Sequence, residues 1–183
     1  MTVLHELASD VGAAERTLRR AVNDGAIRGG RLSPKRVRVA AAEQEWVRRR
    51  WPMVATSRAA LRTQKDVRLA VLFGSMARMD GGEGSDIDVL VELRRPDPVR
   101  LAALEELLGQ AAGRRVQMVR VSDARRLPSL LVSAARDGRV LADRDGVWPR
   151  LLAEARRTEA ELEDPDEVLA ALQPGLVEDT GSV

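Results

Sequence analysis

The chain has 183 residues, enough for one ordinary domain or two small ones, and 44% of them are hydrophobic, which suffices for a packed core. It contains no cysteine, so a disulfide framework and a thiolate metal site are both excluded. No signal peptide opens the sequence and no apolar run approaches about 18 residues, so we expect a cytoplasmic protein that makes no membrane contact.

The formal net charge of +2 is unevenly distributed along the chain. Residues 1–62 hold 13 Lys and Arg against 6 Asp and Glu, whereas residues 63–183 hold 17 against 22. Such asymmetry indicates a module that binds a polyanion, joined to something else. The predicted units are a DNA-binding domain, a second domain, a helical extension and a disordered tail, which cover residues 1–62, 63–146, 147–173 and 174–183.

The first predicted elements are two helices joined by a short turn that contains Gly12. Leu4, Leu7, Leu18 and their apolar neighbours recur at helical spacing, which is the pattern of a helix-turn-helix. The polar face of the second helix carries residues of the kind that contact phosphates and base edges in a DNA major groove. They are Arg16, Thr17, Arg19 and Arg20.

Two short basic segments, residues 27–31 and 35–39, flank a turn that contains Ser33-Pro34. They resemble the β-wing of a winged helix-turn-helix, and their positive charge suits the DNA backbone beside the groove. Within them we expect DNA contacts from Arg31, Lys35 and Arg36. The alternative is a small helical cap with a solvated basic face, but charge, periodicity and turn together favour DNA binding.

A further helix over residues 43–50 carries Trp46 on its inward face. Trp51-Pro52 marks a kink or a boundary, because a residue before proline avoids helical angles. Residues 53–64 are again helical and lead into the first strand of the second unit. The joint between the units has no Gly/Ser-rich linker, so we expect the two to be rigidly coupled.

The most informative stretch of the second unit is residues 67–93. An apolar run ends abruptly at Gly74-Ser75, and Asp86-Ile87-Asp88 then opens a second apolar run. We predict a strand, a tight strand-to-helix turn and another strand. Strand alternation places Asp86 and Asp88 on the same side. Two adjacent carboxylates repel unless a cation lies between them, and carboxylates together with substrate phosphates are the usual ligands of Mg²⁺.

The Gly74-Ser75 turn suits a phosphate. Glycine lets the backbone approach a ligand closely, amide groups at a helix start point at anions, and Ser75 adds a hydroxyl donor. A phosphate cradle that faces a metal-binding carboxylate pair is what attack on the α-phosphorus of a nucleotide requires. The alternative is a strand pair whose aspartates only cap a loop, but the ordered combination favours nucleotidyl transfer.

Gly74-Ser75, ten further residues and Asp86-x-Asp88 resemble the signature of the nucleotidyltransferase β superfamily, especially its minimal nucleotidyltransferase branch. Met76-Ala77-Arg78 fits that branch, although it commonly has a glycine where Met79 stands. The resemblance covers residues 54–142. It implies an α+β fold in which a palm-like mixed sheet with flanking helices follows the winged helix-turn-helix and precedes a C-terminal helix.

The resemblance also implies the chemistry. Asp86 and Asp88 would hold Mg²⁺ or Mn²⁺ and be catalytic, while Gly74, Ser75 and Arg78 would bind the phosphates of ATP or another NTP. The nucleoside monophosphate, most simply AMP, would pass to a protein or RNA acceptor. Members of this branch are often antitoxins, some of which adenylylate a HEPN-family toxin. The resemblance therefore implies an antitoxin that also represses its own operator, and a homodimer is plausible.

One position departs from the resembled family. Its third strand, here within residues 114–121, usually carries a third carboxylate that helps bind metal or acts as general base. The aligned residue is Gln117, which cannot take a proton at neutral pH. Glu92 and Asp123 are the possible substitutes. The alternative function is therefore an inactive winged-helix regulator that uses the transferase fold for nucleotide sensing or dimerisation.

The remaining elements follow from caps and periodicity. Asp97-Pro98 begins a helix, residues 123–137 form a helix interrupted near Pro128, and residues 138–141 form a short strand. A C-terminal helix runs from Trp148. The glycine-rich loop over residues 79–84 is of the kind that closes over a substrate.

Overall fold

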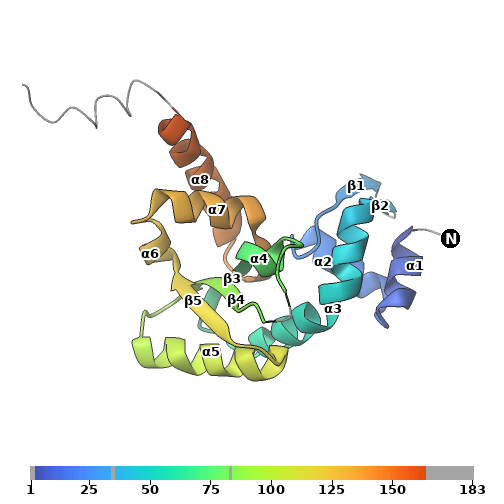
Figure 1. Cartoon of the computed structure of the whole chain (residues 1–183), viewed down its shortest axis with the longest axis horizontal. Coiled ribbons are helices and arrows are strands. Elements are labelled where there is room, and N and C mark those ends of the chain that lie inside the picture. Colours follow the sequence, from blue (N-terminus) through green and yellow to red (C-terminus); the bar gives the residue numbers. More distant parts are fainter. Residues whose placement is uncertain (1–2, 34–35, 83, 164–183) are drawn as a thin grey trace, which may run out of the picture.

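The computed structural model describes residues 3–33, 36–82 and 84–163 (Figure 1). The N-terminal part consists of two short helices and a hairpin: α1 (Val3–Asp10), α2 (Glu15–Asn23), β1 (Gly30–Ser33) and β2 (Arg36–Arg38). These helices and strands were predicted from the sequence. Their identity as a winged helix that binds DNA stays a prediction. Lys35 and the predicted tail lie outside the described residues.

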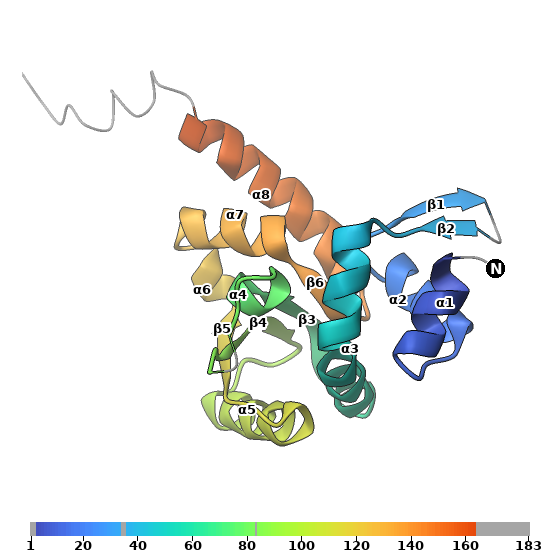
Figure 2. The ribbon, with the colours of Figure 1, turned by 45° about the vertical axis from the view of Figure 1, so that its right-hand side comes forward.

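A single helix, α3 (Ala41–Arg62), joins the N-terminal part to the rest of the chain. Pro52 lies inside it, and the helix changes direction along its length (Figures 1 and 2). Proline has no amide N–H and its ring crowds the carbonyl one turn earlier, which bends a helix. The predicted discontinuity at Trp51-Pro52 is therefore a bend within one helix. Trp46 and Trp51 are both buried, which makes them packing residues.

The second part is built on a four-stranded sheet. Its strands are β3 (Val67–Phe73), β4 (Ile87–Leu93), β5 (Val116–Arg120) and β6 (Arg139–Asp143), in the order β5-β4-β3-β6. β4 and β5 run parallel, whereas β3 pairs antiparallel with both β4 and β6. The predicted α+β fold with a mixed sheet is confirmed.

Helices cover both faces of the sheet (Figure 2). α5 (Pro98–Ala112) and the C-terminal half of α3 pack on one face, and α7 (Pro128–Asp137) and α8 (Val147–Glu163) pack on the other. Two short helices, α4 (Gly74–Ala77) and α6 (Val121–Ala124), complete the chain. As predicted, the Asp97 carboxylate caps α5 by accepting from the Val99 amide at 3.0 Å.

Strand alternation divides the apolar residues between two cores. Ile87, Val89 and Val91 of β4 pack toward α3 and α5, whereas Leu90 packs toward α7 and α8. Asp88 is on the same face as Leu90 but at the start of the strand, where it is only partly covered. The sheet thus presents a carboxylate at the edge of a core. Among the described residues, no helix is long and apolar enough to cross a membrane.

Candidate functional site

Gly74 lies directly against Asp88. Gly74 has a φ of 71°, a left-handed conformation that only glycine adopts readily. A Cβ atom at this position would approach the Asp88 Oδ2 atom to 2.6 Å. Phe73 and Asp88 are partners in the antiparallel β3–β4 ladder, which fixes this contact. Glycine is therefore required here for two independent reasons, and the predicted meeting of the turn with the acidic pair is confirmed.

Asp86 and Asp88 are close enough to influence each other. Burial raises the pKa of the Asp88 carboxyl, the neighbouring Asp86 charge raises it further, and Arg78 opposes both effects. Asp86 is more exposed, and its Oδ2 atom lies 3.6 Å from Nη1 of Arg115. The site thus holds two carboxylates whose mutual repulsion a cation would relieve.

Gln117 lies beside Asp88, in parallel register on β5. Residues in register on adjacent strands project from the same face, so the amide side chain occupies the position at which the third carboxylate was expected. Gln117 is exposed, and its side-chain amide can accept a hydrogen bond but cannot take up a proton. The register thus agrees with the sequence-based placement of Gln117 beside Asp88, and its correspondence to the third carboxylate stays a prediction.

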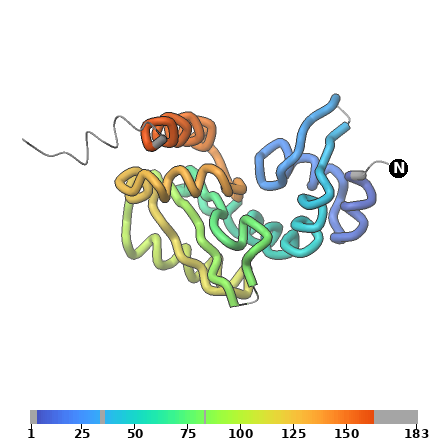
Figure 3. Tube along the Cα trace, turned by 45° about the horizontal axis from the view of Figure 1, so that its top comes forward, coloured from blue at the N-terminus to red at the C-terminus, as the bar shows by residue number. Residues whose placement is uncertain are grey.

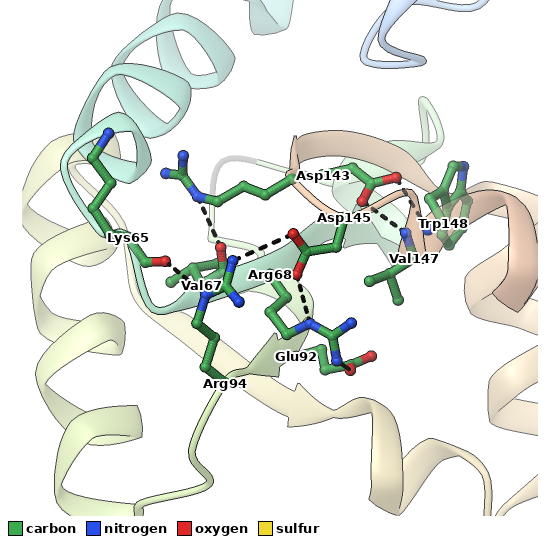
Figure 4. Close-up of polar contacts among 10 residues, drawn as sticks. Lys65, Val67, Arg68, Glu92, Arg94, Asp143, Asp145, Val147 and Trp148 are labelled. Carbon is green, nitrogen blue, oxygen red and sulfur yellow. Dashed lines mark hydrogen bonds and ion pairs between the residues drawn. The ribbon is translucent and has the colours of Figure 1, made fainter.

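Neither proposed substitute for the third carboxylate serves this site. Glu92 accepts a hydrogen bond from Arg68 at 2.5 Å, and Arg68 also donates to Asp145 at 2.8 Å (Figure 4). The Asp123 carboxylate accepts a hydrogen bond from the Arg120 guanidinium at 2.6 Å. Both carboxylates are thus neutralised by arginines elsewhere on the sheet.

Arg78 lies just beyond the short helix that begins at Gly74. α4 ends at Ala77, and Arg78 is extended with a ψ of −168°. The carbonyls that a longer helix would bond internally accept from distant side chains instead, Trp46 Nε1 to Met76 O at 3.1 Å and Arg139 Nε to Ala77 O at 2.6 Å. Arg78 is exposed, and its pairing with Asp80 and Asp137 raises its pKa.

The loop after α4 is fastened from both sides. The Gly81 amide donates to the Ser75 carbonyl at 3.1 Å, and Arg50 of α3 donates to the Gly81 carbonyl at 2.5 Å. Arg114 donates to the Gly82 carbonyl at 3.3 Å. Burial lowers the pKa of Arg50, and the nearby Arg114 charge adds to that effect. Positive charge therefore lines the loop that faces the acidic pair.

A buried ion pair connects the N-terminal half of α3 to the short helix α4. Arg139 and Glu43 are both buried and hydrogen-bond through two atom pairs, one of them at 3.0 Å. The Arg139 guanidinium also stacks over the Trp46 ring at 3.5 Å from its centroid. Arg28 completes the network, since its amide donates to Glu43 at 2.8 Å. We call this set Glu43, Trp46 and Arg139 the filled junction.

The residues predicted to contact DNA are distributed over two surfaces. Arg31 and Arg36 are exposed on the β1–β2 hairpin. Arg16, Thr17 and Arg20 line a cavity between α2, α3 and β6. Arg19 is partly buried and pairs with Glu15 one turn earlier. DNA contact by these side chains stays a prediction, and the charges that the filled junction uses were missed by the sequence interpretation.

The donor set at the acidic pair fits a divalent cation in part. Two carboxylates, one of them partly buried with a raised pKa, are hard oxygen ligands of the kind that Mg²⁺ prefers. Within the described ranges, no group of three or more His, Cys, Asp and Glu side chains is arranged to hold a metal. A cation here would therefore complete its coordination with nucleotide phosphates and water.

Residues 57–146 match the family Polymerase beta, Nucleotidyltransferase. We refer to residues 57–146, which match this family, as the nucleotidyltransferase domain. No curated protein gives a significant match to the chain. The matched range includes the last six residues of α3, the whole four-stranded sheet and the turn that carries Gly74, so the acidic pair lies inside the nucleotidyltransferase domain.

Solved structures confirm the fold of the nucleotidyltransferase domain and its flanking helices. A toxin-antitoxin complex with AMP-PNP aligns at 21% identity with a TM-score of 0.52, over 65% of this chain and 94% of that one. A variant of the toxin-antitoxin MntA-HpeT, with two aspartates changed to glutamate, aligns at 19% identity with a TM-score of 0.53 over the same shares. The minimal nucleotidyltransferase fold of antitoxins thus describes this part of the chain.

Proposed function

We propose that the protein transfers a nucleoside monophosphate, most simply AMP from ATP, to a partner protein in the manner of a toxin-neutralising antitoxin. The observation that carries this proposal is the contact between Gly74 and Asp88, with Asp86 beside them, inside a nucleotidyltransferase domain. Support for a nucleotide comes from the fold shared with a toxin-antitoxin complex that holds AMP-PNP.

In this proposal the two acids and the turn have separate roles. The missing side chain of Gly74 lets the Asp88 carboxylate lie against the turn, where Ser75 and Arg78 offer donors to the polyphosphate oxygens. Asp86 and Asp88 would hold Mg²⁺ or Mn²⁺, which supplies charge neutralisation at the α-phosphorus when bound. The acceptor oxygen forms a bond to that phosphorus, the bond to the bridging oxygen breaks, and pyrophosphate leaves.

Proton removal is where Gln117 matters. A third carboxylate would take the proton of the acceptor hydroxyl, and a glutamine has no basic atom to do so. The proton must pass to Asp86, Asp88 or water. General-base help is typically worth about 10²- to 10⁴-fold, so we expect slow transfer. A Gln117→Asp variant should then transfer faster than the wild type, and an unchanged or lower rate would contradict this role of Gln117.

The decisive experiment incubates the protein with α-labelled ATP, Mg²⁺ and the product of the neighbouring gene. We expect label on that protein, and at least about 100-fold less with Asp88→Asn, because metal-ion stabilisation is worth several kcal/mol. Asp123→Asn removes a carboxylate outside the site and serves as the matched control. Parallel incubation with RNA distinguishes the acceptors, and absence of any label that depends on Asp88 would contradict the proposal.

We also propose that residues 1–62 bind DNA, so that the protein regulates its own operator. The exposed Arg31 and Arg36 on the hairpin, with Lys35 between them in sequence, support a backbone contact. A shift assay with the upstream region should show weaker binding for Arg31→Ala with Arg36→Ala than for the wild type. Equal binding by this double variant would exclude the hairpin as a contact.

If transfer fails while DNA binding holds, the second function remains, a regulator that only senses nucleotide. Gln117 beside Asp88 is the observation that favours it. Its homodimer would be visible as a doubled mass by light scattering. Binding of AMP-PNP with Mg²⁺ and no label transfer would identify this case, whereas any transfer that depends on Asp88 would exclude it.

A further inference from the structure

A cavity of about 510 Å³ lies between α2, the C-terminal half of α3 and β6. In the tube of Figure 3, the blue N-terminal segment that contains α2 and the orange C-terminal segments are far apart in the sequence but belong to one molecule. The walls of the cavity come from three elements that are distant in sequence. α2 contributes Arg16, Thr17 and Arg20, the C-terminal half of α3 contributes Arg58 and Arg62, and β6 contributes Leu141.

Five arginines and two aspartates line this cavity, and several of them already have partners. Arg58 pairs with Asp24 and donates to the Val140 carbonyl at 2.8 Å. Arg144 donates to backbone carbonyls at the end of α3, the nearest at 2.7 Å. The Asp143 carboxylate accepts from the Val147 and Trp148 amides, so it is committed to starting α8 (Figure 4).

Three guanidinium groups remain available. Among the described residues, the side chains of Arg16, Arg20 and Arg62 form no hydrogen bond or ion pair, and the Thr17 hydroxyl has no partner either. Both aspartates on the cavity wall are neutralised or bonded by other groups. The cavity therefore carries an excess of positive charge that no side chain of its walls offsets.

We propose that this cavity binds an organic phosphate of about nucleotide size, in a site separate from the nucleotidyltransferase centre. Guanidinium groups present forked donors that match phosphate oxygens, and three of them converge here with a hydroxyl. The other walls are apolar, with Ala55, Ala59 and Leu141, and suit the uncharged part of such a ligand. The volume lies within the usual range for small-molecule sites, about 300–1,000 Å³.

The size and walls of the cavity also distinguish this ligand from a DNA duplex. A volume of about 510 Å³ accommodates a small phosphorylated molecule, whereas a DNA duplex is too wide to enter it and could contact only its rim. Arg16, Thr17 and Arg20 belong to the predicted DNA-contacting face as well. A bound organic phosphate would therefore compete with DNA for these side chains.

The test is isothermal titration of the full chain with AMP at low salt, with EDTA present so that no metal bridges nucleotide to the acidic pair. We expect measurable binding that weakens about tenfold in Arg62→Ala and again in Arg16→Ala, since a hydrogen bond to a charged group is worth that much. Binding should persist in Asp88→Asn. Arg126→Ala removes an exposed arginine outside the cavity and is the matched control.

Two further measurements decide between sources of the signal. Inorganic phosphate should bind more weakly than AMP, because it cannot use the apolar walls, and equal affinity would overturn the organic-phosphate assignment. Equal AMP affinity in wild type and Arg62→Ala, or loss of AMP binding only in Asp88→Asn, would overturn the site itself. DNA binding that needs Arg62, without any AMP binding, would assign the cavity to DNA. An unchanged melting temperature of Arg62→Ala shows that the variant is folded.

Discussion

The N-terminal part meets the nucleotidyltransferase domain in two places that use arginine in opposite ways. In the filled junction, Arg139 is buried, stacked on Trp46 and paired with Glu43. In the cavity, Arg16 and Arg62 are exposed and have no partner among the described residues. The same residue type fixes the structure where its charge is neutralised and leaves a binding surface where it is not.

The largest expected effect comes from breaking the filled junction. Glu43→Ala leaves the Arg139 charge buried without a counter-charge, and burial already lowers the pKa of Arg139. We expect the free energy of unfolding to fall by about 3–5 kcal/mol in urea denaturation. Glu45→Ala, on the exposed side of the same helix, should cost no more than about 0.5 kcal/mol. Similar losses in the two variants would show that the buried pair has no special role.

A smaller loss is expected from Trp46→Phe, which keeps a ring but removes the N–H that donates to the Met76 carbonyl. Leaving that buried carbonyl unsatisfied should cost about 1–3 kcal/mol. Trp148→Phe is the control, because its ring N–H has no hydrogen-bond partner among the described residues. If both variants lose the same stability, the bond to the turn after Gly74 is not what stabilises the structure.

The acidic pair is intermediate between the filled junction and the cavity, because Asp88 is partly buried and only Arg78 offsets its charge. Burial and Asp86 raise its pKa in the folded state, so its ionisation opposes folding at neutral pH. Asp88→Asn should therefore stabilise the protein at about pH 7.5, and the gain should vanish as the pH falls toward the ordinary aspartate pKa near 4. Urea denaturation at both pH values measures this.

Magnesium provides the matching test of the same carboxylate. Mg²⁺ with AMP-PNP should raise the melting temperature of the wild type, because a ligand that binds only the folded state stabilises it. The part of the rise that requires Mg²⁺, measured as the difference between AMP-PNP with Mg²⁺ and AMP-PNP with EDTA, should be lost in Asp88→Asn. In the urea experiments without ligand, an effect of Asp88→Asn on the free energy of unfolding that is the same at both pH values would contradict the argument from ionisation.

The smallest effect on stability is expected in the cavity. Arg62→Ala removes an exposed side chain without a partner, so the free energy of unfolding should change by less than about 0.5 kcal/mol. AMP affinity should nevertheless fall, and for the wild type it should weaken as ionic strength rises, because charge interactions are screened. A loss of stability as large as that of Glu43→Ala would remove the contrast between the two regions.

Local patterns were sufficient to predict the strands and the acidic pair. Alternation fixes the face of Asp88, and a glycine between an apolar strand and a helix start already predicts a turn of restricted conformation. The position of Gln117 followed from the same alternation one strand later. The short length of the helix after Gly74 could not be predicted, because the side chains of Trp46 and Arg139 donate to its last carbonyls and neither residue is near in sequence.

Neither the filled junction nor the cavity could be predicted, because each depends on how α3 packs. Glu43 and Arg139 are 96 positions apart, and nothing local pairs them. One signal was present, since Arg139 directly precedes the apolar run Val140-Leu141-Ala142, where a charge requires a buried partner. The cavity is lined by α2, α3 and β6, which are distant in sequence, so no local pattern indicates it.

The bend at Pro52 also has a practical consequence for dissecting the protein. The Trp46 side chain of α3 donates to the turn after Gly74, and Leu61 of the same helix packs in the core under the sheet. α3 is therefore a structural part of both halves of the protein and not a flexible linker. A fragment that begins at residue 57 or 63 would lack most or all of α3 and would expose the apolar surface that this helix covers. Separate expression of either half should therefore start or stop outside residues 41–62, with the whole helix retained.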